Sequence, residues 1–150
     1  MFSKLDYCNS LLFGIPHTKL RRLQVLQNHA ARLIFKRSKR ENVSQLLKEL
    51  HWLPIENRIK FKAAVLVFRC LEGTAPTYLC ELIKKYEPVR SLRSSTDKTI
   101  LNVPRTNTNN GCRSFSYFGP KVWNDLPQGV RSAKSLDIFK KSLKTHLFSF

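Results

Sequence analysis

The chain has 150 residues, of which 42% are hydrophobic, so it is long enough to bury a core and lacks the composition of a disordered protein. Lysine and arginine total 27 against 10 aspartate and glutamate residues, a formal net charge of +17. Such an imbalance repels itself in a free compact state, which favours a polyanionic partner, most often RNA or DNA. The alternative is a solvated basic surface with no specific partner.

Membrane insertion and metal binding are not expected. The longest apolar run is Ala63–Phe68, far short of the roughly 20 residues that cross a bilayer. Asp6, Asn9 and Ser10 interrupt the N-terminus where a signal peptide needs an apolar stretch. The four cysteines and four histidines are scattered without the spacing of zinc ligands, so we expect no metal site, no cofactor and reduced thiols inside the cell.

A first amphipathic helix is predicted after Pro16, a residue that suits the first turn of a helix. Apolar residues then recur at spacings of three and four, which marks one helix face. The small residues Ala30 and Ala31 would let a second helix approach closely. The apolar face consists of Leu20, Leu23, Leu26, Ala30, Leu33 and Ile34. Another face carries Arg21, Asn28, Arg32, Lys36 and Lys39.

The stretch His51-Trp52-Leu53-Pro54 is interpreted as a structural corner between two helices. Asn42 can cap the first of these helices, which ends near His51. Pro54 disfavours helical geometry before it and is preset for the first turn of the next helix, leaving Trp52 to cover the joint. A tryptophan fully buried there would stabilise the fold by roughly 3 kcal/mol. Because His51 has no ligand partner at a suitable spacing, a packed corner is favoured over a ligand site.

The helix that follows is apolar on two sides, which predicts a central, well-buried helix from Pro54 to about Leu71, ended by Gly73. Cys70 lies in its apolar run and is expected in the core. A short helix should start at Pro76. The first half is therefore predicted to be a helical bundle.

After Glu87 the chain becomes basic and polar. Thr99–Val103 could form a short strand, and Asn107–Gly111 is a turn signal. Two C-terminal helices follow, with a kink or restart at Gly119-Pro120 and the last helix after Ser135. The predicted fold class is mainly α, and the predicted regions are a bundle over 1–87, a basic connector over 88–113 that includes a short strand or hairpin, and a C-terminal helical segment over 114–150 that packs on the bundle.

Catalytic chemistry is not indicated by the sequence. It contains no glycine-rich phosphate loop and no G-x-S-x-G motif. Two-metal polymerases and nucleases need clustered carboxylates, whereas the acids here stand apart. Asp125, beside Trp123-Asn124, is the most suggestive of them, but an ordinary surface role explains it better. We therefore expect no enzymatic activity.

Six blocks of sequence succeed one another in an order that resembles a known family. They are "LDYCNSLLFGIP", "RLQVLQNHAARLIF", "LLKELHWLPIENRIKFKAAVLVFRCLEGTAPTYL", "RSLRSS", "LNVPRT" and "FGPKVWNDLPQGVRSAKSLDIFKKSLKTHLF". The chain, from Leu5 to Phe148, resembles the thumb and post-thumb region C-terminal to the polymerase core in reverse transcriptases of non-LTR retrotransposons, the LINE elements of the Jockey-like and chicken-repeat-like groups.

The resemblance implies a thumb-like helical bundle and a basic extension that grip template RNA and primed target DNA beside the upstream polymerase core. In that family the catalytic carboxylates, including the Tyr-Ala-Asp-Asp type motif, lie in the upstream fingers and palm, and nothing here matches them or the endonuclease. No catalytic residue is carried over. A chain that starts at Met1 in this place looks like a truncated element copy or a partial gene model, a fragment of an RNA-directed DNA polymerase.

The candidate phosphate contacts fall into two groups. The first group lies on the first helix, where the alternative to phosphate contact is a solvated basic face. The second group lies in the least apolar stretch of the chain, where core packing is a poor explanation for arginines. The candidates are Arg21, Arg22, Arg32, Lys36, Arg90, Arg93, Arg105 and Arg113.

Three further points stay open. The run Lys36–Arg40 resembles a nuclear-localisation signal, and the alternative is that these cations are placed there because the helix dipole favours positive charge at a helix C-terminus. Tyr117, Phe118 and Trp123 could stack on bases, but their helical spacing favours core packing. The alternative function is a protein-interaction module that folds or functions only with the missing polymerase core.

Overall fold

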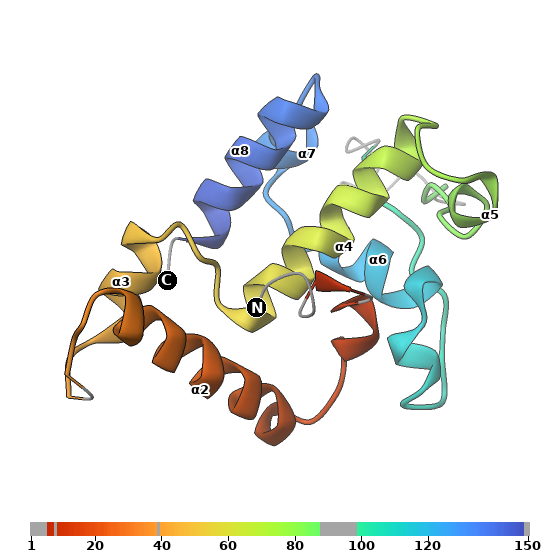
Figure 1. The fold of residues 1–150 in the computed structure, drawn as a ribbon. Coiled ribbons are helices and arrows are strands. Elements are labelled where there is room, and N and C mark those ends of the chain that lie inside the picture. The colour runs from red at the N-terminus through yellow and green to blue at the C-terminus, as the bar shows by residue number, and fades with distance from the viewer. Residues whose placement is uncertain (1–5, 8, 39, 88–98, 149–150) are drawn as a thin grey trace.

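The computed structural model describes residues 6–7, 9–38, 40–87 and 99–148. It is mainly helical, which confirms the predicted fold class. Figure 1 shows α4 running through the centre of the molecule, with α6 and α8 alongside it and α2 and α3 at one edge. The elements are η1 (Asn9–Leu12), α2 (His17–Ile34), α3 (Val43–Glu49), α4 (Ile55–Leu71), α5 (Thr77–Cys80), η3 (Gly111–Arg113), α6 (Phe115–Asn124), α7 (Gln128–Arg131) and α8 (Leu136–Leu147).

The main hydrophobic core lies between α4 and the C-terminal helices. The ring of Phe68 on α4 stacks on Phe139 of α8 with centroids 4.6 Å apart, and Trp123 of α6 stacks on Phe139 at 5.6 Å. The Trp123 indole also donates a 2.7 Å hydrogen bond to the carbonyl of Thr99. Phe118 and Trp123 are almost completely buried, so their predicted place in the core is confirmed. Tyr117 packs against the same core and is half-buried.

Of the predicted kink or restart at Gly119-Pro120, the restart is wrong, because α6 continues through both residues. A proline removes one hydrogen bond from a helix, here the bond from residue 120 to the carbonyl of Ser116, and core packing holds α6 in place without it. Gly119 allows α6 to lie close to α4, since a Cβ at that position would stand 3.2 Å from Cγ2 of Val67.

The predicted strand at Thr99–Val103 is also wrong. Leu101 forms one isolated antiparallel bridge with Lys85. Its own N–H and C=O instead bond to the side chain of Asn124, at 2.9 and 2.8 Å. Backbone bonds from Tyr86 to Ile100 and from Asn102 to Lys84 hold the bridge. Asn124 occupies the opposite edge of Leu101, where a further strand would pair. Part of the predicted connector, residues 88–98, lies outside the described residues.

The packing of α2 differs from the prediction. The fully buried residues of this helix are Gln27 and Ala31. Leu26, Leu33 and Ile34, which belong to the predicted apolar face, are 58%, 80% and 54% exposed. The helix therefore turns a face with buried polar side chains towards α3 and α4 and leaves much of its apolar face outside.

Hydrogen bonds explain this orientation. Nε2 of Gln27 donates to the carbonyl of Leu53 at 2.9 Å, and Oε1 of Gln24 accepts from the N–H of Ile55 at 2.8 Å. Gln24 also donates to Oε1 of Gln27 at 3.0 Å. Buried backbone groups need partners, so the two glutamines satisfy the turn on either side of Pro54. We call Gln24 and Gln27 the glutamine pair.

The predicted corner is present, with Pro54 directly before α4. The chain leaves α3 through a left-handed residue, His51, at φ +53°. Two bonds close this turn, from the N–H of His51 to the carbonyl of Lys48 (2.9 Å) and from the N–H of Trp52 to the carbonyl of Leu47 (2.8 Å), the pattern of a Schellman motif. Trp52 packs against the small core of α2 and α3 but is half-buried, so the full burial assumed from the sequence is wrong.

An ion pair ties the N-terminal segment to α4. Nε and Nη2 of Arg58 donate to the two carboxylate oxygens of Asp6, and Nζ of Lys62 lies 3.7 Å from the same carboxylate. The bond from Arg58 holds the pKa of Asp6 below its usual value. A lowered pKa means that this stabilisation is present above the unfolded-state pKa and disappears as the pH falls through the folded-state pKa.

Replacing Gln27 by alanine should lower the free energy of unfolding by about 1–3 kcal/mol, because the buried carbonyl of Leu53 loses its donor. Urea unfolding followed by circular dichroism measures the change. Gln45→Ala, on the exposed side of α3, is the control and should cost less than about 0.5 kcal/mol. Equal effects of the two substitutions would mean that the bond to Leu53 contributes no net stability.

Replacing His51 by glycine should raise the free energy of unfolding by about 0.5–1 kcal/mol. Glycine removes the steric cost of the left-handed conformation, although it also loosens the unfolded chain. Gln45→Gly, at an exposed position inside α3, should instead cost about 1 kcal/mol. Thermal melts of the two variants should therefore shift in opposite directions, and a lower melting temperature for His51→Gly would contradict the expected relief.

Candidate nucleic-acid interface

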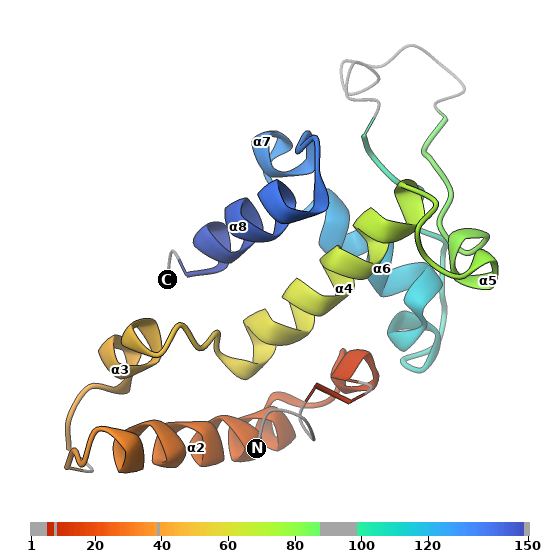
Figure 2. The ribbon, with the colours of Figure 1, turned by 45° about the horizontal axis from the view of Figure 1, so that its top comes forward.

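The first candidate cations lie on α2, which forms an edge of the molecule with one long side facing outward (Figure 2). Between Asp6 and Glu41 the sequence contains no acidic residue. The same segment contains the cations Lys19, Arg21, Arg22, Arg32, Lys36, Arg37, Lys39 and Arg40. This edge of the molecule therefore carries positive charge that no acidic residue within the segment balances.

Helix geometry places the cations on the side of α2 that neighbours α3. Residues 21, 28 and 32 fall within about 40° of one another at 100° per residue. Arg21 and Asn28 line one hollow together with Val43 and Leu47 of α3. Lys36 follows the helix in a left-handed conformation at φ +52°. We call Arg21, Arg32 and Lys36 the basic flank of α2.

Three of the four candidates near α2 are available to a ligand. Arg21, Arg22 and Lys36 are exposed and take part in none of the ion pairs of the described residues. Arg32 is half-buried and donates from Nη2 to the carbonyl of Glu41 at 3.3 Å, so it also holds the loop after the helix. From Arg21 to Arg32 the helix rises about 16 Å, a length comparable to about five nucleotides of one strand.

The second group of candidates is not gathered into one surface with the first. Arg105 is exposed. Arg113 is half-buried, and its Nη2 donates to the carbonyl of Leu11 at 2.8 Å. Its side chain also passes close to Gly14, where an added Cβ would stand 2.9 Å from Cγ of Arg113. Arg113 therefore joins the segment before α6 to the turn before α2. Arg90 and Arg93 lie outside the described residues.

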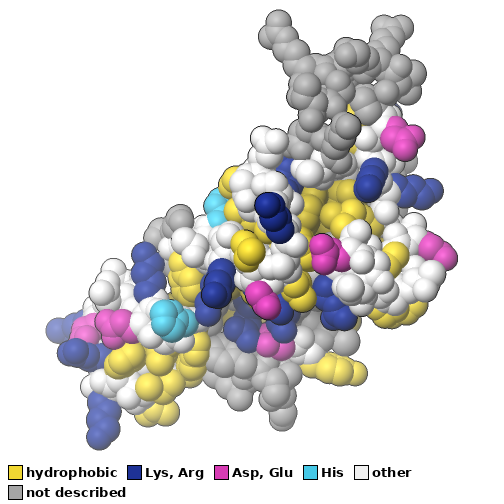
Figure 3. Space-filling model, turned by 90° about the horizontal axis from the view of Figure 1, so that it is seen from above, with side chains coloured by type: hydrophobic (Ala, Val, Ile, Leu, Met, Phe, Trp, Pro, Cys, Tyr) yellow, Lys and Arg dark blue, Asp and Glu magenta, His cyan; other side chains and the backbone are white. Residues whose placement is uncertain are grey.

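The surface is basic over a wide area. On the face shown in Figure 3, lysine and arginine side chains are spread out rather than collected in one patch, and hydrophobic side chains are exposed between them. Such a distribution suits contacts to a backbone of regularly spaced charges more than recognition of a single small anion.

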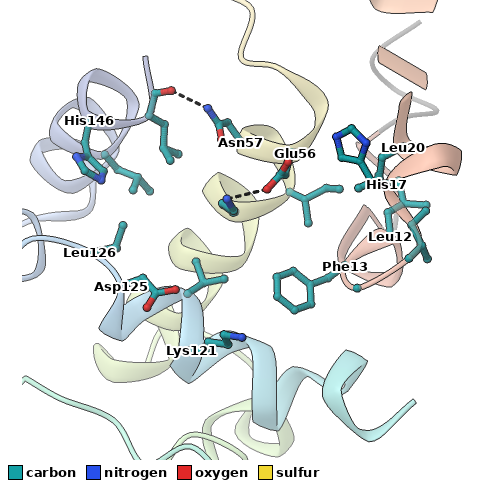
Figure 4. Close-up of a pocket in the computed structure, with 17 residues that line it drawn as sticks. Leu12, Phe13, His17, Leu20, Glu56, Asn57, Lys121, Asp125, Leu126 and His146 are labelled. Atoms are coloured by element: carbon teal, nitrogen blue, oxygen red, sulfur yellow. Dashed lines mark hydrogen bonds and ion pairs between the residues drawn. The ribbon is translucent and has the colours of Figure 1, made fainter. Parts of the chain in front are cut away.

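A cavity of about 580 Å³ lies between η1, α2, α4, α6 and α8, and Figure 4 shows its polar rim. Glu56 is already paired with Lys60 at 2.9 Å, and Nδ2 of Asn57 donates to the carbonyl of Leu147 at 2.9 Å. Asp125, the acid singled out from the sequence, is exposed on the opposite side of the rim. Glu56 stands on α4, whereas Asp125 directly follows α6 (Figure 4).

Metal ligands and reactive thiols are not assembled in the described part of the chain. Its histidine, cysteine, aspartate and glutamate side chains form no group of three or more that could hold a metal ion. Cys70 is buried, as expected, and burial, followed by the neighbouring Cys80 thiol, raises the pKa of Cys70 to about 11. This thiol stays protonated at neutral pH and is a poor nucleophile.

None of the helices among the described residues is both long and apolar enough to cross a membrane.

Comparison of the chain with protein-family models, curated proteins and solved structures finds no match in any of the three.

Sequence reasoning missed the roles of Gln24, Gln27 and Arg113. Two glutamines three residues apart on a helix are a weak signal, but they would share one face, and that face turns out to be buried. Nothing in the sequence near Arg113 indicates its bond to Leu11, because the two residues are 102 positions apart.

Arg113→Ala should lower the free energy of unfolding by about 1–2 kcal/mol, since it removes a charged donor to a backbone carbonyl. It should leave the salt dependence of nucleic-acid binding unchanged. Arg105→Ala, an exposed arginine of the same segment, serves as the control and should leave stability unchanged. Normal stability of Arg113→Ala together with a flatter salt dependence would make Arg113 a phosphate contact instead.

Proposed function

We propose that this chain is a non-catalytic nucleic-acid-binding region that corresponds to the thumb and post-thumb part of a LINE-type reverse transcriptase. Its task would be to grip template RNA or target DNA through phosphates, with little sequence preference. The observation that carries the proposal is the acid-free segment between Asp6 and Glu41, whose helix lies at an edge of the fold with Arg21, Arg22 and Lys36 exposed.

Physical chemistry supports this assignment. The excess of seventeen positive charges attracts polyanions whatever their sequence. Cations that are exposed and outside internal ion pairs can exchange bound counterions for phosphates, which is the main source of non-specific affinity. The resemblance to the thumb and post-thumb region supplies the biological setting, because such regions lie beside the template and primer.

A second candidate is a protein-interaction module that acts together with a polymerase core. One observation favours it, namely the exposure of Leu26, Leu33 and Ile34 on α2. An isolated chain that aggregates through these side chains and binds no RNA would support this candidate over the first.

The salt dependence of binding tests the nucleic-acid proposal. The logarithm of affinity for duplex DNA should fall linearly with the logarithm of salt concentration, by about 0.9 for each phosphate contact, and affinity should drop by orders of magnitude between about 50 and 200 mM. Arg21→Ala combined with Lys36→Ala should flatten the slope by about 0.9 for each phosphate that is no longer bound. Fluorescence anisotropy with labelled RNA and DNA of several sequences provides the measurement.

The matched control is Lys134→Ala combined with Lys141→Ala, which removes two exposed cations near and on α8 and changes the net charge equally. It should leave the slope close to that of the unaltered protein. If both double variants flatten the slope equally, the affinity comes from net charge alone. A shallow slope in the unaltered protein, or no binding at low salt, would reject the proposal.

A further inference from the structure

The apolar residues of α2 form a strip that borders the basic flank, because Arg21 lines one hollow with Leu26, and Arg32 and Lys36 line another with Leu33. Leu23, Leu26, Ala30 and Leu33 follow one another at spacings of three, four and three, so they share one side of the helix. Leu26 and Leu33 are 58% and 80% exposed. Most surface helices place such a strip on the core, whereas here the glutamine pair takes that position. We call these four residues the apolar flank.

Basic side chains accompany the apolar flank. Lys19, Arg22 and His29 stand one turn before Leu23, Leu26 and Leu33, respectively. Arg22 and Leu26 line one shallow hollow on the outer side of α2, and His29 and Leu33 line the next. A surface that offers aliphatic contact beside positive charge is complementary to apolar side chains accompanied by carboxylates.

The first hollow has the arrangement by which one helix receives a side chain of another. Residues 22, 25, 26 and 29 contribute to it and are spaced i, i+3, i+4 and i+7, the four-residue hole of helix–helix packing. The second hollow continues past the end of α2, where Lys36 joins His29, Arg32 and Leu33.

We propose that the apolar flank of α2 docks an amphipathic α-helix of another protein, one whose apolar stripe is bordered by aspartate and glutamate. Nucleic acid fits this strip less well, because α2 contains no phenylalanine, tyrosine or tryptophan on which bases could stack. A second copy of this chain fits less well too, because a symmetric contact would bring two helices that contain cations and no acids against each other. The inference does not rest on the nucleic-acid proposal.

The test uses the full chain and a labelled synthetic peptide of about three heptads, with leucine along one stripe and glutamate beside it. A second peptide has alanine in place of each leucine, which preserves charge and helix propensity. Anisotropy titrations should show that the leucine peptide binds at least about tenfold more tightly than the alanine peptide. The double variant Leu26→Ser/Leu33→Ser should lose this preference. Its salt dependence for RNA should stay the same.

Ile138→Ser is the matched control, because Ile138 is an exposed aliphatic residue on α8, 53% accessible, and its replacement should not affect peptide binding. If the double variant melts at a lower temperature, Leu33→Ser alone replaces it, since Leu33 is the more exposed of the two. Equal binding of both peptides would overturn the proposal in favour of attraction by charge alone. Dimerisation that Leu33→Ser abolishes would identify a second copy as the occupant, and weaker RNA binding by the double variant would assign the strip to nucleic acid.

Discussion

The carbonyl of Leu53 and the N–H of Ile55 lie on either side of Pro54, and both bond to glutamine side chains of α2. The N–H of Ile55 belongs to the first residue of α4, where a helix has no internal partner for its donors. The glutamine pair of α2 therefore supplies the hydrogen-bond acceptor that the first N–H of α4 lacks within its own helix. Because these bonds fix the rotation of α2 about its own axis, they decide which of its side chains face the core and which face the surroundings.

Helix boundaries were predictable because local chemistry sets them. Asn42 accepts from the N–H of Ser44 at 3.0 Å and caps α3, Pro54 precedes α4, and Gly73, at φ +68°, ends it. The orientation of α2 and the isolated bridge at Leu101 were not predictable in this way. The orientation of α2 depends on side chains that bond to backbone groups 26 and 31 positions away. The bridge depends on backbone bonds that join residues 84 and 86 to residues 102 and 100. An apolar pattern carries no information about such bonds, so it assigned the wrong face of α2 to the core.

In the candidate interface, too, some features were predictable from the sequence and others were not. Exposed cations on an edge helix follow from residue type and spacing, whereas the structural role of Arg113 follows from a distant partner. The first turn of α2 contains no acidic residue, and Lys19, Arg21 and Arg22 stand near its positive dipole end. That arrangement works against the helix in isolation. An anion bound there would offset the repulsion, so ligand binding and helix stability are thermodynamically linked.

The stacking of Phe68 on Phe139 has a consequence for how the chain emerges from the ribosome. The two rings meet 4.6 Å apart, yet they are 71 positions apart in sequence. At synthesis rates of about 5–20 residues per second, Phe68 is made roughly 4–14 s before Phe139, the residue that covers it. Until Phe139 has been made, Val67 and Phe68 of α4 have no cover from α8. The order of synthesis, and not only the final packing, therefore determines when the apolar side chains of this core become buried and can no longer cause aggregation.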